Sequence, residues 1–194
     1  AEFVFASQER QFARLEALNF LCQEDRQGIL VTNVSGIKLL LPSPKVFASS
    51  IFQLKVGQEI DLTTLSETLQ KIGYQKVSQV LQQGEFSLRG DILDIFEIDQ
   101  LQPYRIEFFG DEIDGIRIFD PESQRSVENV EEVQLKAVSD LLLQEEDFIR
   151  GQKQIEQLQE QSANEEFKSY LAEILGDISQ RKLHPDLRKF ISFF

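Results

Sequence analysis

Two segments in the first 75 residues have the hydrophobic period of an amphipathic helix. In SQERQFARLEALNFLC the apolar residues recur every three or four positions, and Ser7 stands where an N-cap is expected. In DLTTLSETLQKIGY either Asp61 or Thr63 can cap the helix, and Gly73 stands where it would stop. The residues predicted to face the core are Phe12, Leu15, Leu18 and Cys22 in the first helix, and Leu62, Leu65, Leu69 and Ile72 in the second.

Two short apolar runs lie between these helices. Residues 29–31 and 37–41 are continuous apolar stretches, which are typical of buried strands. Pro42 and Pro44 come next and indicate a loop. This loop is a natural first domain boundary, so we expect residues 1–50 to be separate from the rest of the chain.

The middle of the chain, residues 51–137, has the pattern of paired strands. EFSLRGDILDIFEI and PYRIEFFGDEIDGIRIF are rich in Ile, Phe and Tyr and are separated by the turn-like DQLQP. Gly110 and Asp111 predict a tight hairpin within the second run, and EEVQLKAV predicts a further strand. From about Ser139 the helical period returns. The predicted fold class is α+β: a mixed, hairpin-rich sheet flanked by helices, followed by a mostly helical segment, residues 138–194.

Composition and charge narrow the classes of function. The content of 41% hydrophobic and 27% charged residues is ordinary for a soluble globular protein. A net charge of −13 argues against binding to nucleic acid or to an anionic membrane, because phosphate neutralisation needs clustered Lys and Arg. No apolar run approaches the ~20 residues that a membrane span needs. The single cysteine, Cys22, cannot form an internal disulfide, which favours the reducing cytoplasm.

The two ends of the sequence suggest a piece of a longer protein. The chain starts at Ala1 and contains no Met. It ends on FISFF, an apolar run that soluble proteins do not normally leave exposed. We therefore expect a fragment whose C-terminal neighbour is missing.

Three motifs that could carry chemistry have simpler explanations. DEID, residues 111–114, looks like the acidic box of a nucleotide-driven motor, but the sequence has no GxxxxGK[ST] loop to hold phosphates. RGD, residues 89–91, resembles an adhesion tripeptide, but Gly90 can simply let a strand bend or bulge. His184 is the only histidine, so neither a zinc site nor a catalytic triad is expected. We predict no catalytic residue, no cofactor and no metal site.

One aromatic residue breaks the alternation of the strand YRIEFF. Side chains alternate along a strand, so the apolar Ile106 and Phe108 share one face. The other face carries Arg105, Glu107 and Phe109. Arginine and aromatic residues are enriched at binding hot spots, so Arg105 and Phe109 form a candidate patch that points into solvent. Alternatively, a helix or a missing neighbour covers Phe109, which would make it an ordinary core residue.

The central sequence resembles a known family. GEFSLRGDILDIFEIDQLQPYRIEFFGDEIDGIRIFDPESQRS is similar to the homology module shared by bacterial transcription-repair coupling factors (Mfd) and the excision-repair helicase UvrB. The flanking AEFVFAS, RLEALNFL and TLQKIGYQKV look like the coupling-factor version. The resemblance implies the end of domain 1a in residues 1–50, domain 2 in residues 51–137 and the start of domain 1b in residues 138–194.

The resemblance implies a non-catalytic role in nucleotide excision repair. In the family, domain 2 recruits UvrA, the damage-recognition subunit, to sites of stalled RNA polymerase. The contact residues stand in the contexts RG-x-x-x-D-x-F and PYR-x-x-FF, which fall on Arg89, Arg105 and Phe109. Asp91 departs from the pattern, because related sequences often carry a small residue there. The alternative is the equivalent UvrA-binding module of a UvrB-type helicase.

Further partners are implied by the resemblance alone. The family's ATP-driven DNA translocase contacts RNA polymerase and upstream duplex DNA through domains absent from this sequence. In the full-length proteins a C-terminal domain covers the UvrA-binding surface until polymerase is engaged. The resemblance implies a cytoplasmic location and no membrane partner.

Overall fold

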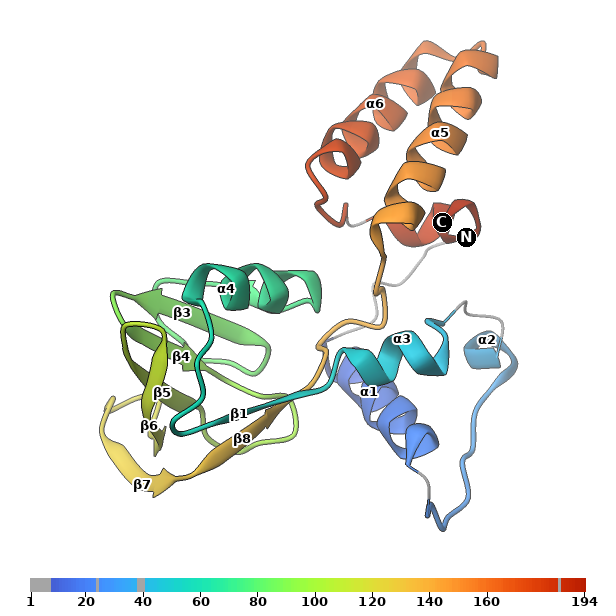
Figure 1. The fold of residues 1–194 in the computed structure, drawn as a ribbon. Helices are drawn as coiled ribbons and strands as arrows, with labels where there is room; N and C mark the ends of the chain where they lie inside the picture. The colour runs from blue at the N-terminus through green and yellow to red at the C-terminus, as the bar shows by residue number, and fades with distance from the viewer. Residues whose placement is uncertain (1–7, 24, 38–40, 185) are drawn as a thin grey trace. The chain divides into compact units, whose positions relative to one another are not determined.

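The computed structural model describes residues 8–23, 25–37, 41–184 and 186–194 (Figure 1). Contacts divide the chain into two compact units, and each is treated by itself. The first comprises residues 1–32 and 41–142, and the second comprises residues 33–40 and 143–194.

The first unit contains three helices and all the named strands. The helices are α1 (Gln8–Cys22), α3 (Pro44–Ser49) and α4 (Leu62–Lys71). The strands are β1 (Phe52–Lys55), β2 (Gln75–Lys76), β3 (Glu85–Arg89), β4 (Ile92–Ile95), β5 (Tyr104–Phe109), β6 (Glu112–Phe119), β7 (Ser126–Val130) and β8 (Glu132–Leu135).

The strands form two sheets. The larger has six strands in the order β2-β3-β4-β5-β6-β7, and the smaller pairs β1 with β8. All the pairings are antiparallel except that of β2 with β3, which is parallel. The predicted α+β class with a mixed, hairpin-rich sheet is confirmed.

Glycine turns build the two hairpins at the centre of the larger sheet. Gly110 has φ 64° and joins β5 to β6 at the predicted position. Gly90 has φ 59° and joins β3 to β4. Such left-handed conformations are readily adopted by glycine, and they match the twist of paired strands. The expectation that Gly90 only bends or bulges one strand is therefore wrong, because it closes a hairpin.

One core lies beneath the larger sheet. Its centre is formed by alternate residues of the strands, including the fully buried Phe86, Leu93 and Ile106, together with Leu65 and Leu69 of α4. Asp61 caps α4, since its Oδ1 accepts a hydrogen bond from the amide of Thr64 at 2.7 Å. Cys22 packs against the same core and is not in a disulfide.

The sequence-based expectations for residues 29–31 and for the segment after Pro42 are wrong. Residues 29–31 form no strand, and Ile29 and Val31 are almost fully exposed. A short apolar run becomes a strand only where a neighbour can pair with its backbone, and the pattern alone does not provide one. Pro44 begins α3, with Ser43 as its N-cap, so the predicted loop contains a short helix. Ser7 lies outside the described residues.

The second unit is helical. It contains α2 (Val34–Ile37), α5 (Glu145–Gln161), α6 (Glu165–Ser179) and a 3-10 helix, η1 (Leu187–Phe193). Helices α5 and α6 run antiparallel, side by side (Figure 1). Ile37 ends a short helix, so a strand over residues 37–41 is wrong at its first position, while residues 38–40 lie outside the description.

The apolar run FISFF packs within this helical unit. Phe190 is buried, and the Nε of Arg150 donates a hydrogen bond to the carbonyl oxygen of Phe194 at 3.0 Å. The apolar residues of this run are therefore buried or partly buried within the described part of the chain. Aromatic residues of η1 supply the apolar surface that covers the helical hairpin.

Candidate functional site

Strand β5 separates an apolar face from a polar face, as the alternation predicts. Ile106 and Phe108 are buried in the core. Phe109, the last residue of the strand, is 84% exposed. Within the described residues nothing covers this ring, so the alternative in which a helix of this chain covers Phe109 is wrong, while cover by a missing neighbour stays untested.

Arg105 lies on the polar face but does not extend into solvent. Its Nε donates to Oδ1 of Asp94 at 2.7 Å, and its Nη2 donates to Oδ2 at 2.9 Å. The Nη2 atom also donates to Oε1 of Gln124 at 3.1 Å. The guanidinium stacks 4.5 Å from the centroid of the Phe119 ring, and the side chain is only 17% exposed. Arg105 is therefore anchored, which corrects the expectation that it points into water together with Phe109.

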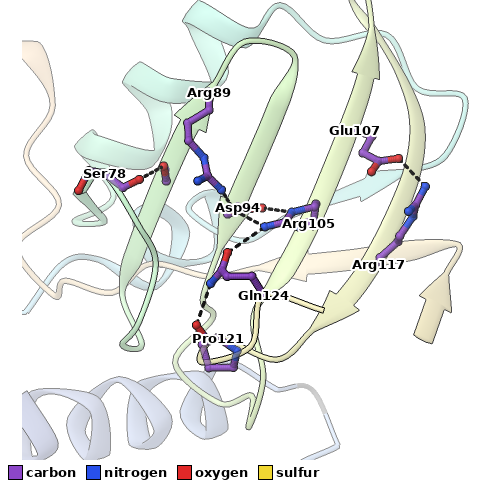
Figure 2. Close-up of polar contacts among 9 residues, drawn as sticks. Ser78, Arg89, Asp94, Arg105, Glu107, Arg117, Pro121 and Gln124 are labelled. Carbon is purple, nitrogen blue, oxygen red and sulfur yellow. Dashed lines mark hydrogen bonds and ion pairs between the residues drawn. The ribbon is translucent and has the colours of Figure 1, made fainter. Parts of the chain in front are cut away.

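Arg89 binds the same carboxylate from the other side. Its Nη2 donates to Oδ2 of Asp94 at 2.6 Å, and its side chain is 50% exposed. Asp94 itself is 1% exposed, so two guanidinium groups hold one buried carboxylate (Figure 2). We call Arg89, Asp94 and Arg105 the arginine cluster.

The register of three strands brings the cluster together. Asp94 of β4 stands directly opposite Ser87 of β3 and opposite Arg105 of β5. Arg89 is two residues beyond Ser87, so it shares the same face and lies diagonal to Asp94. A side chain as long as that of arginine can reach across such a diagonal. The hairpin at Gly90 fixes this register, so the cluster depends on that turn.

A second ion pair lies on the same face. Arg117 of β6 stands opposite Arg105, and its Nη2 donates to an oxygen of Glu107 at 2.6 Å (Figure 2). The face carries three arginines and three carboxylates, since Glu85 of β3 also lies on it, so its formal charges balance, whereas the whole chain carries −13. The charged and hydroxyl side chains of this polar sheet face are those of Glu85, Ser87, Arg89, Asp94, Arg105, Glu107 and Arg117.

A β-bulge separates the tip of the hairpin from its stem. Glu107 pairs with Gly115, but the next residue, Phe108, pairs with Ile113. Asp114 is therefore the extra residue of β6, and Phe109 lies beyond the bulge. The arginine cluster belongs to the regular part of the sheet and Phe109 to its tip.

The structure brings together two of the three predicted site residues. Arg89 and Arg105 meet on Asp94, while Phe109 lies four positions along β5 from Arg105 on the polar side of the strand. Sequence reasoning missed the roles of Asp94 and Gln124. The signal for Asp94 was a lone carboxylate in the otherwise apolar run ILDI, whereas Gln124 gave none.

The other motifs take no part in this site. Asp111 lies in the β5–β6 turn and Asp114 in the bulge, both exposed. His184 accepts a hydrogen bond on Nδ1 from the amide of Asp186 at 3.1 Å. In the part of the chain that the structure describes, no group of three or more His, Cys, Asp or Glu residues could hold a metal ion. No described helix combines the length and hydropathy needed to cross a bilayer.

One further carboxylate is buried, at the end of the segment that comes after β4. Glu97 is 1% exposed and accepts hydrogen bonds from the Tyr74 hydroxyl at 3.3 Å and from the amides of Lys136 and Asp99 at 2.9 and 3.1 Å. Burial raises the pKa of Glu97 to about 7 from its ordinary value of 4.5. Burial also raises the pKa of the Tyr74 hydroxyl, and the Glu97 carboxylate adds to that shift.

Comparison with known sequences identifies the family. The family described as "UvrB interaction domain" matches residues 52–140. The transcription-repair-coupling factor of Bacillus subtilis (strain 168) is 31% identical over 202 residues, which cover 100% of this chain and 17% of that protein. That of Staphylococcus aureus (strain bovine RF122 / ET3-1) is 39% identical over 145 residues, which cover 75% of this chain and 12% of that protein.

This chain is a UvrB-homology module of the coupling-factor type. The resemblance seen in the sequence is thereby confirmed. The module spans less than a fifth of either relative. The matched range, 52–140, contains Arg89, Arg105 and Phe109. The predicted division of the module at residues 50 and 137 stays a prediction.

Proposed function

We propose that this chain is a non-catalytic module that binds UvrA in transcription-coupled nucleotide excision repair. In this proposal Arg89, Arg105 and Phe109 form the docking surface. The observation that carries it is the 84% exposure of Phe109, on the same sheet face as the arginine cluster in an acidic chain. The coupling-factor relatives and the UvrB interaction family support the assignment.

Phe109 is suited to be an anchor of the interface. Burying a phenylalanine side chain in a partner contributes ~1.5–3 kcal/mol through apolar area removed from water. Because the ring makes little contact with its own fold, that free energy is available to a partner. The partner should therefore offer an apolar pocket.

The arginine cluster is suited to recognise acidic or carbonyl groups beside that pocket. A guanidinium has five N–H donors in a planar arrangement, and Asp94 and Gln124 use only some of those on Arg89 and Arg105. The remaining donors can reach carboxylates or backbone carbonyls of UvrA. We therefore expect binding to weaken as salt rises.

Calorimetric titration of UvrA with the chain tests the proposal. Phe109→Ala should weaken binding by about 2 kcal/mol, or roughly 30-fold, as at other aromatic hot spots. Arg89→Ala should weaken it by roughly tenfold. Leu101→Ala is the matched control, because Leu101 is a 94% exposed apolar residue away from the polar sheet face. Wild-type affinity in Phe109→Ala would remove the ring from the interface.

Arg105 requires a milder substitution than charge reversal. In Arg105→Glu the new carboxylate would stand beside the buried Asp94, so the variant would be destabilised and any lost binding would be ambiguous. Arg105→Lys keeps the positive charge but loses the paired hydrogen bonds. We expect this variant to fold and to bind UvrA about tenfold more weakly.

The role at stalled RNA polymerase is part of the same proposal for the full-length protein. There, the module would bring UvrA to a polymerase that separate translocase domains engage together with upstream DNA. A C-terminal domain would cover the docking surface until then. The isolated chain should therefore bind UvrA more tightly than the full-length protein does, and it should hydrolyse no ATP.

A further inference from the structure

We infer that Asp94 is the positioning residue of the docking surface, and that Arg89 provides most of the free donors. Asp94 holds Arg105 flat against the sheet and holds Arg89 beside it, without touching the partner. This inference rests on the proposed function for its partner, UvrA. Its structural half, the orientation of the two guanidinium groups, can be tested without that partner.

Asp94 has no surface with which to bind a partner. It is 1% exposed, and both carboxylate oxygens are occupied: Oδ1 by Arg105, and Oδ2 by Arg105 and Arg89. A buried carboxylate is tolerated only where charged donors satisfy it. Any effect of Asp94 on binding must therefore pass through the arginines.

The two arginines differ in the number of N–H donors that remain for a partner. Arg105 uses Nε once and Nη2 twice and is 17% exposed, which leaves Nη1 as its free group within the described contacts. Arg89 uses Nη2 once and is 50% exposed, so Nε and Nη1 remain free among those same contacts. Arg89 therefore offers the larger share of donors, while Arg105 forms the support beside it.

Gln124 supports Arg105 from the β6–β7 connection. Its Oε1 accepts from Nη2 of Arg105 at 3.1 Å, and its Nε2 donates to the carbonyl of Pro121 at 2.7 Å. The backbone of Gln124 has φ 60°, a left-handed conformation that is uncommon for residues other than glycine. The loop thus places the amide over Arg105 at some conformational cost.

Fixing the guanidinium groups before binding raises affinity. A free arginine loses rotamer entropy when it is immobilised at an interface, and this loss opposes binding. Without the carboxylate, the two neighbouring guanidinium groups also repel each other. The Asp94 carboxylate removes both costs in the unbound protein.

Asp94→Asn is the first test, with Glu107→Gln as its matched control. Both changes remove one carboxylate charge from the same sheet face, but among the described contacts the Glu107 carboxylate accepts its hydrogen bond from Arg117 and acts on Arg105 through charge alone. We expect Asp94→Asn to weaken UvrA binding about tenfold, and Glu107→Gln to change it less than twofold. Equal affinity of Asp94→Asn and wild type would overturn the inference.

A double-mutant cycle separates positioning from direct contact. In an Arg89→Ala background, Asp94→Asn should lose most of its effect on affinity, because the main donor that it positions is absent. Additive losses would overturn the inference, since they would require Asp94 to act independently of Arg89.

The free protein provides a readout that does not depend on UvrA. In a ¹H–¹⁵N spectrum the Nε–H of Arg105 should be shifted and slow to exchange with solvent. Asp94→Asn should abolish that signature and Glu107→Gln should preserve it. If the wild type shows the signature but does not bind UvrA, the proposed function fails and the docking role of Asp94 fails with it, while Asp94 still orients the arginines.

Gln124→Gly keeps the inference testable if Asp94→Asn does not fold. Glycine accepts φ 60° readily, so the variant removes the amide without straining the backbone. We expect UvrA binding about threefold weaker than wild type and faster exchange of the Arg105 Nε–H. Unchanged affinity and exchange would contradict a positioning network around Arg105.

Discussion

Two carboxylates three residues apart are buried to the same extent but are satisfied in opposite ways. Asp94 and Glu97 are each 1% exposed. Asp94 is held by two guanidinium groups, so its charge is compensated. Glu97 is held by a hydroxyl and two backbone amides, which are neutral donors. The same burial therefore accompanies a carboxylate paired with two guanidinium groups at the polar sheet face and, just after β4, a carboxylate whose pKa is raised to about 7.

The comparison shows what a charged partner does for a buried acid. Neutral donors complete the hydrogen bonds of a carboxylate, but they do not offset the free energy needed to move its charge out of water. The Lys136 ammonium lies near Glu97, but it forms an ion pair with Asp99. Glu97 therefore keeps the raised pKa that burial imposes. The two carboxylates should therefore differ most in their effect on the free energy of unfolding, either when one of them is removed or when the pH is changed.

Removing the Asp94 carboxylate should have the largest effect on stability. Asp94→Ala leaves Arg89 and Arg105 facing each other without a counter-ion, and we expect the free energy of unfolding to fall by about 3–4 kcal/mol at pH 7. Urea denaturation followed by circular dichroism measures this change. A loss below about 1 kcal/mol would show that water satisfies the two guanidinium groups as well as Asp94 does.

Titration of Glu97 should give the next largest effect, with a defined sign. Its pKa is about 7 in the folded state and 4.5 ordinarily, so between these values the folded state binds more protons than the unfolded state. The stabilisation is complete below about pH 4.5 and is lost as the pH rises through about 7. We expect this group to lower the free energy of unfolding by about 3 kcal/mol across that range.

Glu97→Gln isolates this contribution. The variant cannot ionise, so its stability should fall less than that of the wild type between pH 5 and pH 8. Relative to wild type, it should therefore gain stability as the pH rises. Parallel pH profiles for the two proteins, measured by thermal unfolding, would assign the titration to another group.

The smallest expected effect concerns the hydroxyl that binds Glu97. Tyr74→Phe removes the 3.3 Å hydrogen bond but keeps the buried ring, so we expect a loss of about 1 kcal/mol. The pKa of Glu97 should rise further, because its charged form loses a donor. Carboxyl NMR shifts against pH measure this, and an unchanged pKa would show that the two amides suffice.

The sequence predicted the parts of the fold that depend on local signals. The hairpin at Gly110 and the cap at Asp61 are local, because turn and cap residues act on their neighbours. The strand expected at residues 29–31 failed because a strand depends on a partner that no local pattern provides. The packing of FISFF within the helical unit was not predicted, because it likewise depends on a partner segment.

The sequence predicted which residues belong to the candidate site, but it did not predict the contacts between them. Alternation alone placed Arg105 and Phe109 on one face, and the family contexts added Arg89. The pairing of two arginines with Asp94 depends on the register of three strands, which the sequence does not state. The contact with Gln124 depends on the conformation of a loop, so no periodic signal could reveal it.

The bulge at Asp114 divides the β5–β6 hairpin into a tip, which carries Phe109, and a regular ladder, which carries Arg105. An extra residue absorbs changes of length or twist where it occurs, so alterations at the tip need not shift the ladder below it. Under the proposed function, Phe109 could be exchanged to suit a different pocket while the arginine cluster keeps its alignment. In that proposal, the residue that would select the partner lies beyond the bulge, and the regular ladder lies before it.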